Sequence, residues 1–293
     1  MKFWKRLLLL MLLVFLGFAL CMVVGIPAVF IQKSGHMVFY MHLLQWTQNL
    51  VVMMLVPLLW IRLVYLSDRP EEATWKQSLH ELGLLRFEIR PAVLAFCATV
   101  CAIPLLDALE VLPYKCPLPD GLRAYCEEEL LANQAVMSVV LQPGGFFGWL
   151  ELVLLMCLST AIGEEMLFRG ALLRCFRQYT KLNRHAVAVL VGLVFALIHF
   201  ELYGLIPRWL LGTVFVYAVY WTRSLWPAII MHFTNNLVAL IVFKTQDDPF
   251  NLADGKEFSF GPLMIVLSVA LTGVLLWLLS SNKAQNPSAN ASV

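Results

Sequence analysis

The chain has 293 residues, of which 60% are hydrophobic and only 14% are charged, and its mean hydropathy is +0.78. These values exclude an ordinary soluble domain and indicate a polytopic membrane protein. The formal net charge of +2 is too small to indicate binding to nucleic acid or to an acidic partner. We therefore predict an all-α fold, a transmembrane helical bundle.

Long apolar runs predict about eight transmembrane helices. The first run, residues 7–31, is too long for the apolar core of a signal peptide, which spans roughly 7–15 residues, and we interpret it as an uncleaved helix. Runs of about 20 apolar residues define the rest, although the fifth and sixth are shorter. The predicted spans cover residues 7–31, 42–66, 91–112, 146–176, 185–200, 209–221, 225–243 and 261–280.

Basic residues set the predicted orientation. If the N-terminus is inside, 15 of the 21 lysines and arginines fall on the inner side of the membrane. The positive-inside rule then places both termini in the cytoplasm. Arg169 lies within a span and belongs to the inner count only formally, and leaving it out does not change the orientation.

The chain divides into three predicted parts. Residues 1–145 hold the first three spans and a long outer segment, residues 113–145, in which apolar positions recur with a helical rhythm and predict a helix on the membrane surface. Residues 146–243 hold spans four to seven and the motifs described below. Residues 244–293 hold the last span and a polar, low-complexity tail that we expect to be disordered.

The seven cysteines are mostly in or beside apolar runs, where cysteine behaves as a small hydrophobic residue. Cys116 and Cys126 lie in the polar outer segment instead. They are the one pair for which a disulfide stays open, and only if that segment faces an oxidising compartment.

Three ionisable residues interrupt the fourth span, in the segment GEEMLFRG at residues 163–170. A charged side chain at the centre of a membrane helix costs roughly 2.5–3.5 kcal/mol on insertion scales, so each one is a functional hypothesis by default. Glu165 and Arg169 are four residues apart on one helical face and are predicted to form an ion pair. Glu164 points about 100° away around the helix and needs partners from other helices.

The fifth and seventh spans supply those partners. Phe195 and His199 are four residues apart, and so are His232 and Asn236, so each pair shares a helical face. Glu164 precedes the turn at residues 180–183 by as many residues as His199 follows it. An antiparallel hairpin therefore places both about 24 Å from that turn.

The seventh span reaches the same level. Counted from Arg223, where that span begins, His232 and Asn236 lie roughly 14 and 20 Å into the membrane. We expect side chains from three helices to meet in this layer.

The order Glu-Glu-x-x-x-Arg, Phe-x-x-x-His and His-x-x-x-Asn on separate membrane helices resembles the CPBP family, which contains the type II CAAX prenyl endopeptidases and the bacteriocin-processing and immunity enzymes. The three motifs stand at residues 164–169, 195–199 and 232–236, without departure at the motif positions. The resemblance covers residues 146–243, which it marks as the catalytic core. It implies a glutamate-dependent intramembrane endopeptidase that needs no cofactor.

Roles carried over by position follow from this resemblance. Glu164 and His199 would bind and activate a water molecule, and His232 and Asn236 would polarise the scissile carbonyl and hold the oxyanion. Glu165 and Arg169 would fix the helix and tune the field around Glu164. From the residues themselves, Phe195 is predicted to pack against the ring of His199.

Two plainer interpretations of the same residues remain. Taken alone, the glutamates and Arg169 are explained by a helix-stabilising ion pair near a membrane boundary. Alternatively, Glu164, His199 and His232 form a credible three-ligand zinc site with water in the fourth position. The chain has no HExxH motif, because His199 is followed by Phe and Glu, and the resemblance favours catalysis without a metal.

Three function classes are compatible with the motifs. The first is an intramembrane protease acting on a membrane-associated or lipidated peptide, with the bilayer as its other partner. The second is a non-catalytic relative that binds a membrane partner in immunity or signalling. The third is a transporter that uses Glu164 and the histidines as a proton relay, against which the lack of paired broken helices argues. The expected location is the plasma (inner) membrane if the chain is prokaryotic, and the oligomeric state stays open.

Overall fold

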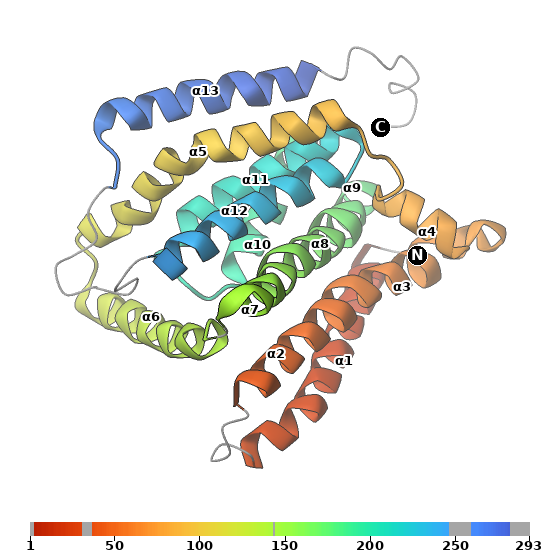
Figure 1. Cartoon of the computed structure of the whole chain (residues 1–293). Coiled ribbons are helices and arrows are strands. Elements are labelled where there is room, and N and C mark those ends of the chain that lie inside the picture. Colours follow the sequence, from red (N-terminus) through yellow and green to blue (C-terminus); the bar gives the residue numbers. More distant parts are fainter. Residues whose placement is uncertain (1–2, 31–36, 143, 246–258, 282–293) are drawn as a thin grey trace.

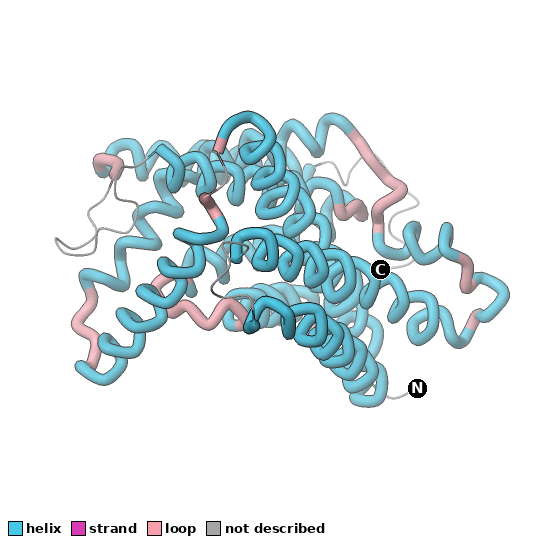
Figure 2. Tube along the Cα trace, turned by 60° about the horizontal axis from the view of Figure 1, so that its bottom comes forward, coloured by secondary structure: helices cyan, strands magenta, loops and turns pink. Residues whose placement is uncertain are grey.

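The computed structural model describes residues 3–30, 37–142, 144–245 and 259–281, and within these ranges the fold is helical and contains no strand. The helices form one bundle in which most of the long helices run in a similar direction (Figure 1). Figure 2 shows that short loops join them. The all-α prediction is confirmed. The predicted disordered tail lies beyond residue 281, outside the described residues.

Six helical stretches in the described part of the chain are long and apolar enough to cross a membrane. Each coincides with a predicted span. They are α1 (Phe3–Phe30, with Phe3–Ile26 as its membrane span), the second span Met37–Asp68, α5 (Ile89–Lys115), the fourth span Gly145–Gln178, α12 (Trp226–Thr245) and α13 (Pro262–Ser280). The chain is therefore an integral membrane protein.

The two predicted spans that looked short correspond to α10 (Arg184–Leu197) and α11 (Leu205–Thr222), which are not among the six. These helices pack directly on each other through two glycines. A Cβ atom on Gly212 would lie 3.0 Å from the Cα of Gly192, so the two backbones touch where the side chains are absent. The close approach brings α11 against the centre of the bundle.

Two further helices, α6 and α4, lie outside the six membrane-spanning stretches. The outer segment contains α6 (Asp120–Val140), which crosses the end of the bundle between α5 and the fourth span (Figure 1). A helix is therefore present in this segment, as predicted, and its position on the membrane surface stays a prediction. At the opposite end lies α4 (Trp75–Leu82), whose N-terminus is capped by the hydroxyl of Thr74. Gly83 ends it with φ of +80°, a conformation that glycine adopts at little cost.

The helices that carry the three motifs lie in the middle of the bundle (Figure 1). On one side α1 and the second span pack against the fourth span, and on the other side α5 packs against α11, α12 and α13. The boundary predicted at residue 145 divides the sequence but not the bundle in space, because helices from both ends of the chain enclose the central group. The first turn of α1, the last turn of α13 and α4 lie toward the same end of the bundle (Figure 1). Which compartment this end faces stays a prediction.

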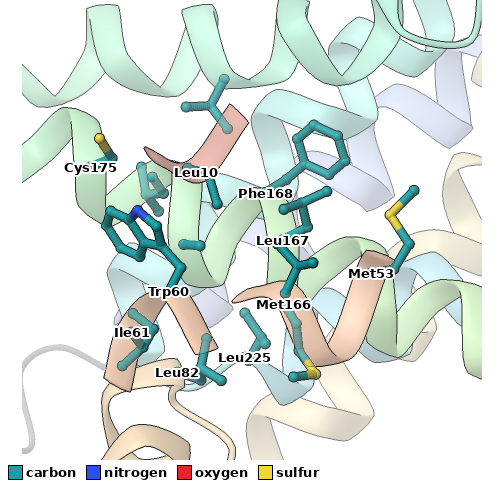
Figure 3. Close-up of a cluster of buried hydrophobic side chains, with 14 of the residues drawn as sticks. Leu10, Met53, Trp60, Ile61, Leu82, Met166, Leu167, Phe168, Cys175 and Leu225 are labelled. Atoms are coloured by element: carbon teal, nitrogen blue, oxygen red, sulfur yellow. The ribbon is translucent and has the colours of Figure 1, made fainter. Parts of the chain in front are cut away.

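The largest core cluster joins the N-terminal helices to the fourth span. Trp60 is fully buried there, and its indole Nε1 donates to the backbone oxygen of Arg6 in α1 (3.0 Å). Figure 3 shows Trp60 and Ile61 beside side chains of the GEEMLFRG segment and of α1. This packing supports the fourth span from one side, at the residues that directly follow its glutamates.

Candidate active site

The predicted ion pair of the fourth span is present and completely buried. Arg169 Nη1 donates to Glu165 Oε1 at 2.8 Å, and both side chains have 0% exposure. A buried ion pair is stable only when further hydrogen bonds satisfy its remaining atoms. Arg169 Nη2 makes one such bond, to the backbone oxygen of Gly212 in α11 (2.9 Å), whereas Arg169 Nε and Glu165 Oε2 have no hydrogen-bond partner among the described residues.

Aromatic rings enclose the guanidinium group of Arg169. Its carbon lies 4.5 Å from the ring centre of Phe195 and 5.2 Å from that of Phe215. Phe168, its neighbour in sequence, is at 5.9 Å. Such cation–π contacts replace part of the hydration that the charge loses on burial. The arginine therefore ties the fourth span to both α10 and α11.

His232 in α12 contacts both glutamates of the fourth span. Its Nδ1 lies 2.9 Å from Glu165 Oε1, and its Nε2 lies 3.7 Å from Glu164 Oε2. Phe215 stacks on the imidazole, with ring centres 5.6 Å apart and an angle of 26°, and Phe195 meets its edge at 5.7 Å. These two aromatic contacts restrain the imidazole and so fix the directions of its two nitrogens.

Glu164 is the glutamate that retains access from outside the protein. Its side chain is 13% exposed, whereas that of Glu165 is fully buried. Glu164 Oε2 is buried and makes no hydrogen bond with any described residue. At 3.7 Å the nitrogen of His232 is beyond direct hydrogen-bonding distance, and a polar gap of this length is typically bridged by a water molecule.

His199 lies in the turn that follows α10, which ends at Leu197. Its Nδ1 lies 2.8 Å from the backbone oxygen of Phe195, which can only accept, so Nδ1 carries the hydrogen. In the neutral ring Nε2 is then a free acceptor. The described residues contain no direct hydrogen bond between His199 and Glu164. The ring of Phe195 lies between the two histidines, 5.1 Å from that of His199 and 5.7 Å from that of His232.

Asn236 lies one turn beyond His232 on the same helix. Its Nδ2 is 3.3 Å from the backbone oxygen of Met156, in the wide-wound turn that precedes the glutamates. The amide thus contacts the fourth span and is partly exposed. All seven residues singled out in the sequence belong to one connected region built from the fourth span, α10 and α12.

The second span is hydrogen-bonded to the turn of the fourth span that precedes Glu164. Asn49 is buried, and its Nδ2 lies within hydrogen-bonding distance of Ser159 Oγ (2.7 Å), Thr160 Oγ1 (3.1 Å) and Leu155 O (3.2 Å). A Cβ atom on Gly163 would come within 2.6 Å of the Cβ of Met53 in the same helix. Glycine at residue 163 therefore allows the two helices to approach at the level of the glutamates.

The fourth span is wound unevenly around its ionisable residues. Widened π-helical turns occupy Val153–Ser159 and Met166–Leu172, and only the short α8 (Thr160–Glu165) between them has ordinary α geometry. The opposite helix has a similar widened stretch at Gln48–Leu55. Such turns are rare and concentrate at functional sites.

Several contributors were not identified from the sequence. Phe215 and Gly212 come from α11, a span to which no role was assigned, and Asn49 comes from the second span. No local motif marks them, because their roles depend on how each helix is rotated. Glu201 and Arg208 form a partly buried ion pair (2.6 Å) at the start of α11.

The zinc alternative needs three ligands gathered around one point. Within the described ranges, no group of three His, Cys, Asp or Glu side chains is arranged so that it could hold a metal ion. Glu164, His199 and His232 are neighbours, but they do not form such a group in this conformation. We therefore derive no step through a metal.

Comparison with protein families agrees with this geometry. The family model described as type II CAAX prenyl endopeptidase Rce1-like matches residues 146–238, which contain every motif residue. The matched segment is about a third of the chain and is similar to the CAAX protease family. Searches of curated proteins and of solved structures found no match. The family match supports an integral membrane hydrolase of the intramembrane endopeptidase kind, in agreement with the resemblance seen in the motifs.

Proposed function

We propose that this chain hydrolyses a peptide bond in a membrane-associated or lipidated peptide, with Glu164 as the base that activates water. One observation carries the proposal. Glu164 Oε2 is buried without a partner and faces His232 Nε2 across a gap of 3.7 Å. A gap between a carboxylate and an imidazole nitrogen suits a water molecule or a substrate carbonyl oxygen.

The neighbouring glutamate is unsuited to this role. Glu165 is fully buried, and its Oε1 is already engaged by Arg169 and His232, although its Oε2 has no partner. The ion pair with Arg169 neutralises the negative charge of Glu165. Glu164 is the carboxylate that water can reach, which supports different roles for two adjacent glutamates.

The reaction follows from these positions. Glu164 takes one proton from the water while the water oxygen bonds to the scissile carbonyl carbon, and His199 Nε2 accepts a hydrogen bond from the hydrogen that stays on this oxygen and so orients it. The carbonyl oxygen gains negative charge as the tetrahedral intermediate forms. When the carbon–nitrogen bond breaks, the proton passes from Glu164 to the departing amine. Every proton removed from water is thus accounted for.

His232 and Asn236 are the proposed donors to the oxyanion. Glu165 receives the Nδ1 hydrogen of His232, so it directs Nε2 toward Glu164, and a protonated ring donates from Nε2. Asn236 reaches the same space by exchanging its hydrogen bond with Met156 for one to the substrate.

The proposed substrate enters from the bilayer or from its cytoplasmic face, because the motif residues lie within membrane helices. The plasma (inner) membrane is the proposed location for a prokaryotic owner. The mechanism needs no metal, since a carboxylate and an imidazole supply both base and orientation. Zinc held by Glu164, His199 and His232 is the competing mechanism, and it makes the opposite prediction for chelation.

The test uses purified full-length chain in lipid nanodiscs and a panel of peptides with and without a lipid-modified cysteine near the C-terminus. We expect at least one member to be cleaved, and Glu164→Gln to abolish cleavage. Glu128→Gln in α6 is the matched control and should leave the rate unchanged. Cleavage that persists in Glu164→Gln overturns the proposed mechanism.

Two further outcomes separate the alternatives. Activity that disappears on chelation and returns with zinc overturns the metal-free mechanism while keeping the protease. A wild-type chain that binds panel members without cleaving any overturns the protease and favours a partner-binding protein.

A further inference from the structure

A second internal space lies behind the candidate active site, away from the glutamates. It is a cavity of about 200 Å³ between α5, α11, α12 and α13. Leucine, valine and alanine side chains form most of its wall. No charged residue lines it. It owes its volume to small residues, since Ala98 and Ala102 lie one turn apart on α5 and Gly273 faces them from α13.

One end of the cavity opens on the lipid-facing surface. Val269 is 50% exposed and Leu210 is 39% exposed, and both line the space. A Cβ atom on Gly273 would meet nothing within 4 Å, so the wall is open at this point. Because these residues belong to or adjoin membrane spans, the mouth is continuous with the hydrocarbon interior of the bilayer.

The other end is closed by two buried side chains. Phe215 and Met231 are each 1% exposed, and Phe215 stacks on His232 on its far side. The ring separates the cavity from the carboxylates. A molecule that enters from the bilayer therefore stops one aromatic ring short of the proposed catalytic groups.

The wall can hold a hydrocarbon chain but not a polar head group. Its polar side chains are two threonines, and Thr99 Oγ1 already donates to the backbone oxygen of Ala95 (3.0 Å). Thr272 Oγ1 is buried and has no partner among the described residues. A single hydroxyl cannot satisfy a phosphate or an ester group. An apolar space of this kind does not retain water, and left empty it loses dispersion contacts along its whole wall.

We infer that this cavity binds one hydrocarbon chain of a bilayer lipid, inserted between α11 and α13 with its end against Phe215 and Met231. The site is distinct from the proposed peptide-cleaving site, because Phe215 closes the passage between them. Occupancy fills the space behind Phe215, which supports both His232 and Arg169. The lipid thereby completes the packing on which the geometry of the motif residues depends.

Photo-crosslinking tests this inference without any measurement of cleavage. The full-length chain is reconstituted in nanodiscs that contain phosphatidylcholine with a diazirine at the end of one acyl chain, and adducts are mapped by mass spectrometry after illumination. We expect adducts on Met231 or Phe215, although both are closed to the outside. Phe15 on the lipid-facing side of α1 reports ordinary contact with the bilayer.

Cavity-blocking variants make the result decisive. Gly273→Leu places a side chain at the mouth, and Ala102→Leu fills the interior independently should the first variant fail to fold. Both should remove the adducts on Met231 and Phe215 and leave those on Phe15. Val274→Leu, at an exposed neighbour that does not line the cavity, is the matched control and should change neither.

Three outcomes overturn the inference. If Met231 and Phe215 carry no adducts in the wild-type chain, no lipid chain is inserted. If the adducts persist in both blocking variants, these residues are labelled by another route. Competition by a lipidated peptide, but not by unlabelled phosphatidylcholine, would assign the cavity to substrate. None of these results depends on Glu164, so the proposed function is tested separately.

Discussion

Two buried histidines, His42 and His232, each contact a glutamate, and they differ in the surroundings of the second ring nitrogen. His42 of α2 (Met37–Thr47) bonds through Nδ1 to Glu151 (2.8 Å) and through Nε2 to the backbone oxygen of Val140 (2.9 Å). His232 bonds through Nδ1 to Glu165, but its Nε2 faces Glu164 across 3.7 Å. The first imidazole has both nitrogens engaged, and the second has one.

The difference separates a structural link from a reactive site. A backbone oxygen only accepts, so Nε2 of His42 donates to Val140 O, and Nδ1 lies within hydrogen-bonding distance of Glu151. Both ring nitrogens have a partner, and the pair joins α2, the end of α6 and α7 (Gly145–Leu152). At His232 the nitrogen and the oxygen of Glu164 remain available to a third molecule. A buried histidine thus indicates chemistry when its hydrogen bonds are incomplete.

The largest expected effect comes from removing the free carboxylate. Glu164→Gln should lower the rate of peptide cleavage by on the order of 10²–10⁴-fold, because general-base catalysis is lost. Glu151→Gln is the same chemical change in the closed pair and should retain the rate. Initial rates on one cleaved peptide measure both. Equal losses in the two variants would contradict the distinction drawn between the pairs.

Replacing His232 and His42 in turn tests the difference between the two pairs further. His232→Phe should lower the cleavage rate by roughly 10²–10³-fold, as loss of one oxyanion donor does. His42→Phe leaves Val140 O and Glu151 unpaired and should lower the free energy of unfolding by about 1–3 kcal/mol, with a normal rate in the folded fraction. Cleavage rates and unfolding in detergent are measured side by side. A His42 variant that folds normally but does not cleave would refute this assignment.

Changes to the buried Glu165–Arg169 pair should lower the stability of the protein. Glu165→Gln leaves Arg169 buried without its charged partner and should cost roughly 3–5 kcal/mol of unfolding free energy. The double variant Glu165→Met with Arg169→Met removes both charges and should recover most of that loss. Cleavage should stay low in the double variant, because His232 loses the group that orients it. Full activity there would show that the pair only stabilises the helix.

The smallest effect concerns two cysteines of the outer segment, both of which are free thiols. Cys116 is exposed, whereas burial raises the pKa of the Cys126 thiol. A raised pKa lowers the thiolate fraction at neutral pH, so Cys126 should be alkylated more slowly than Cys116 and should react faster only as the pH rises. Iodoacetamide labelling followed by peptide mass spectrometry measures the two rates. Recovery of the two peptides joined by a disulfide would contradict this arrangement.

Hydropathy and spacing were sufficient to predict the helices and the layer in which the motifs meet. The Glu165–Arg169 pair follows from residues four apart on one helix, a geometry that depends on nothing outside that helix. The histidine that lies nearest to Glu164 cannot be predicted in this way. The length of the hairpin fixes the depth of His199 in the membrane but not the rotation of α10 about its own axis. His232 is the histidine that the bundle turns toward the glutamates.

Contacts between distant segments could not be predicted for the same reason. Phe215 and Gly212 lie in an ordinary apolar stretch, and Asn49 is one polar residue in a long span. Their roles arise when glycine-mediated packing sets the rotation of α11 and when the second span approaches Gly163. Sequence gives each helix its length and apolar content, but partners are selected by packing.

The central claim is that Glu164 activates water and does not itself attack the peptide. A single turnover in ¹⁸O-labelled water, with enzyme in excess over a cleaved peptide, tests this most directly. We predict one ¹⁸O atom in the new carboxyl group of the product and none in the side chain of Glu164. Label recovered in Glu164 after that turnover would show a covalent intermediate and contradict the account.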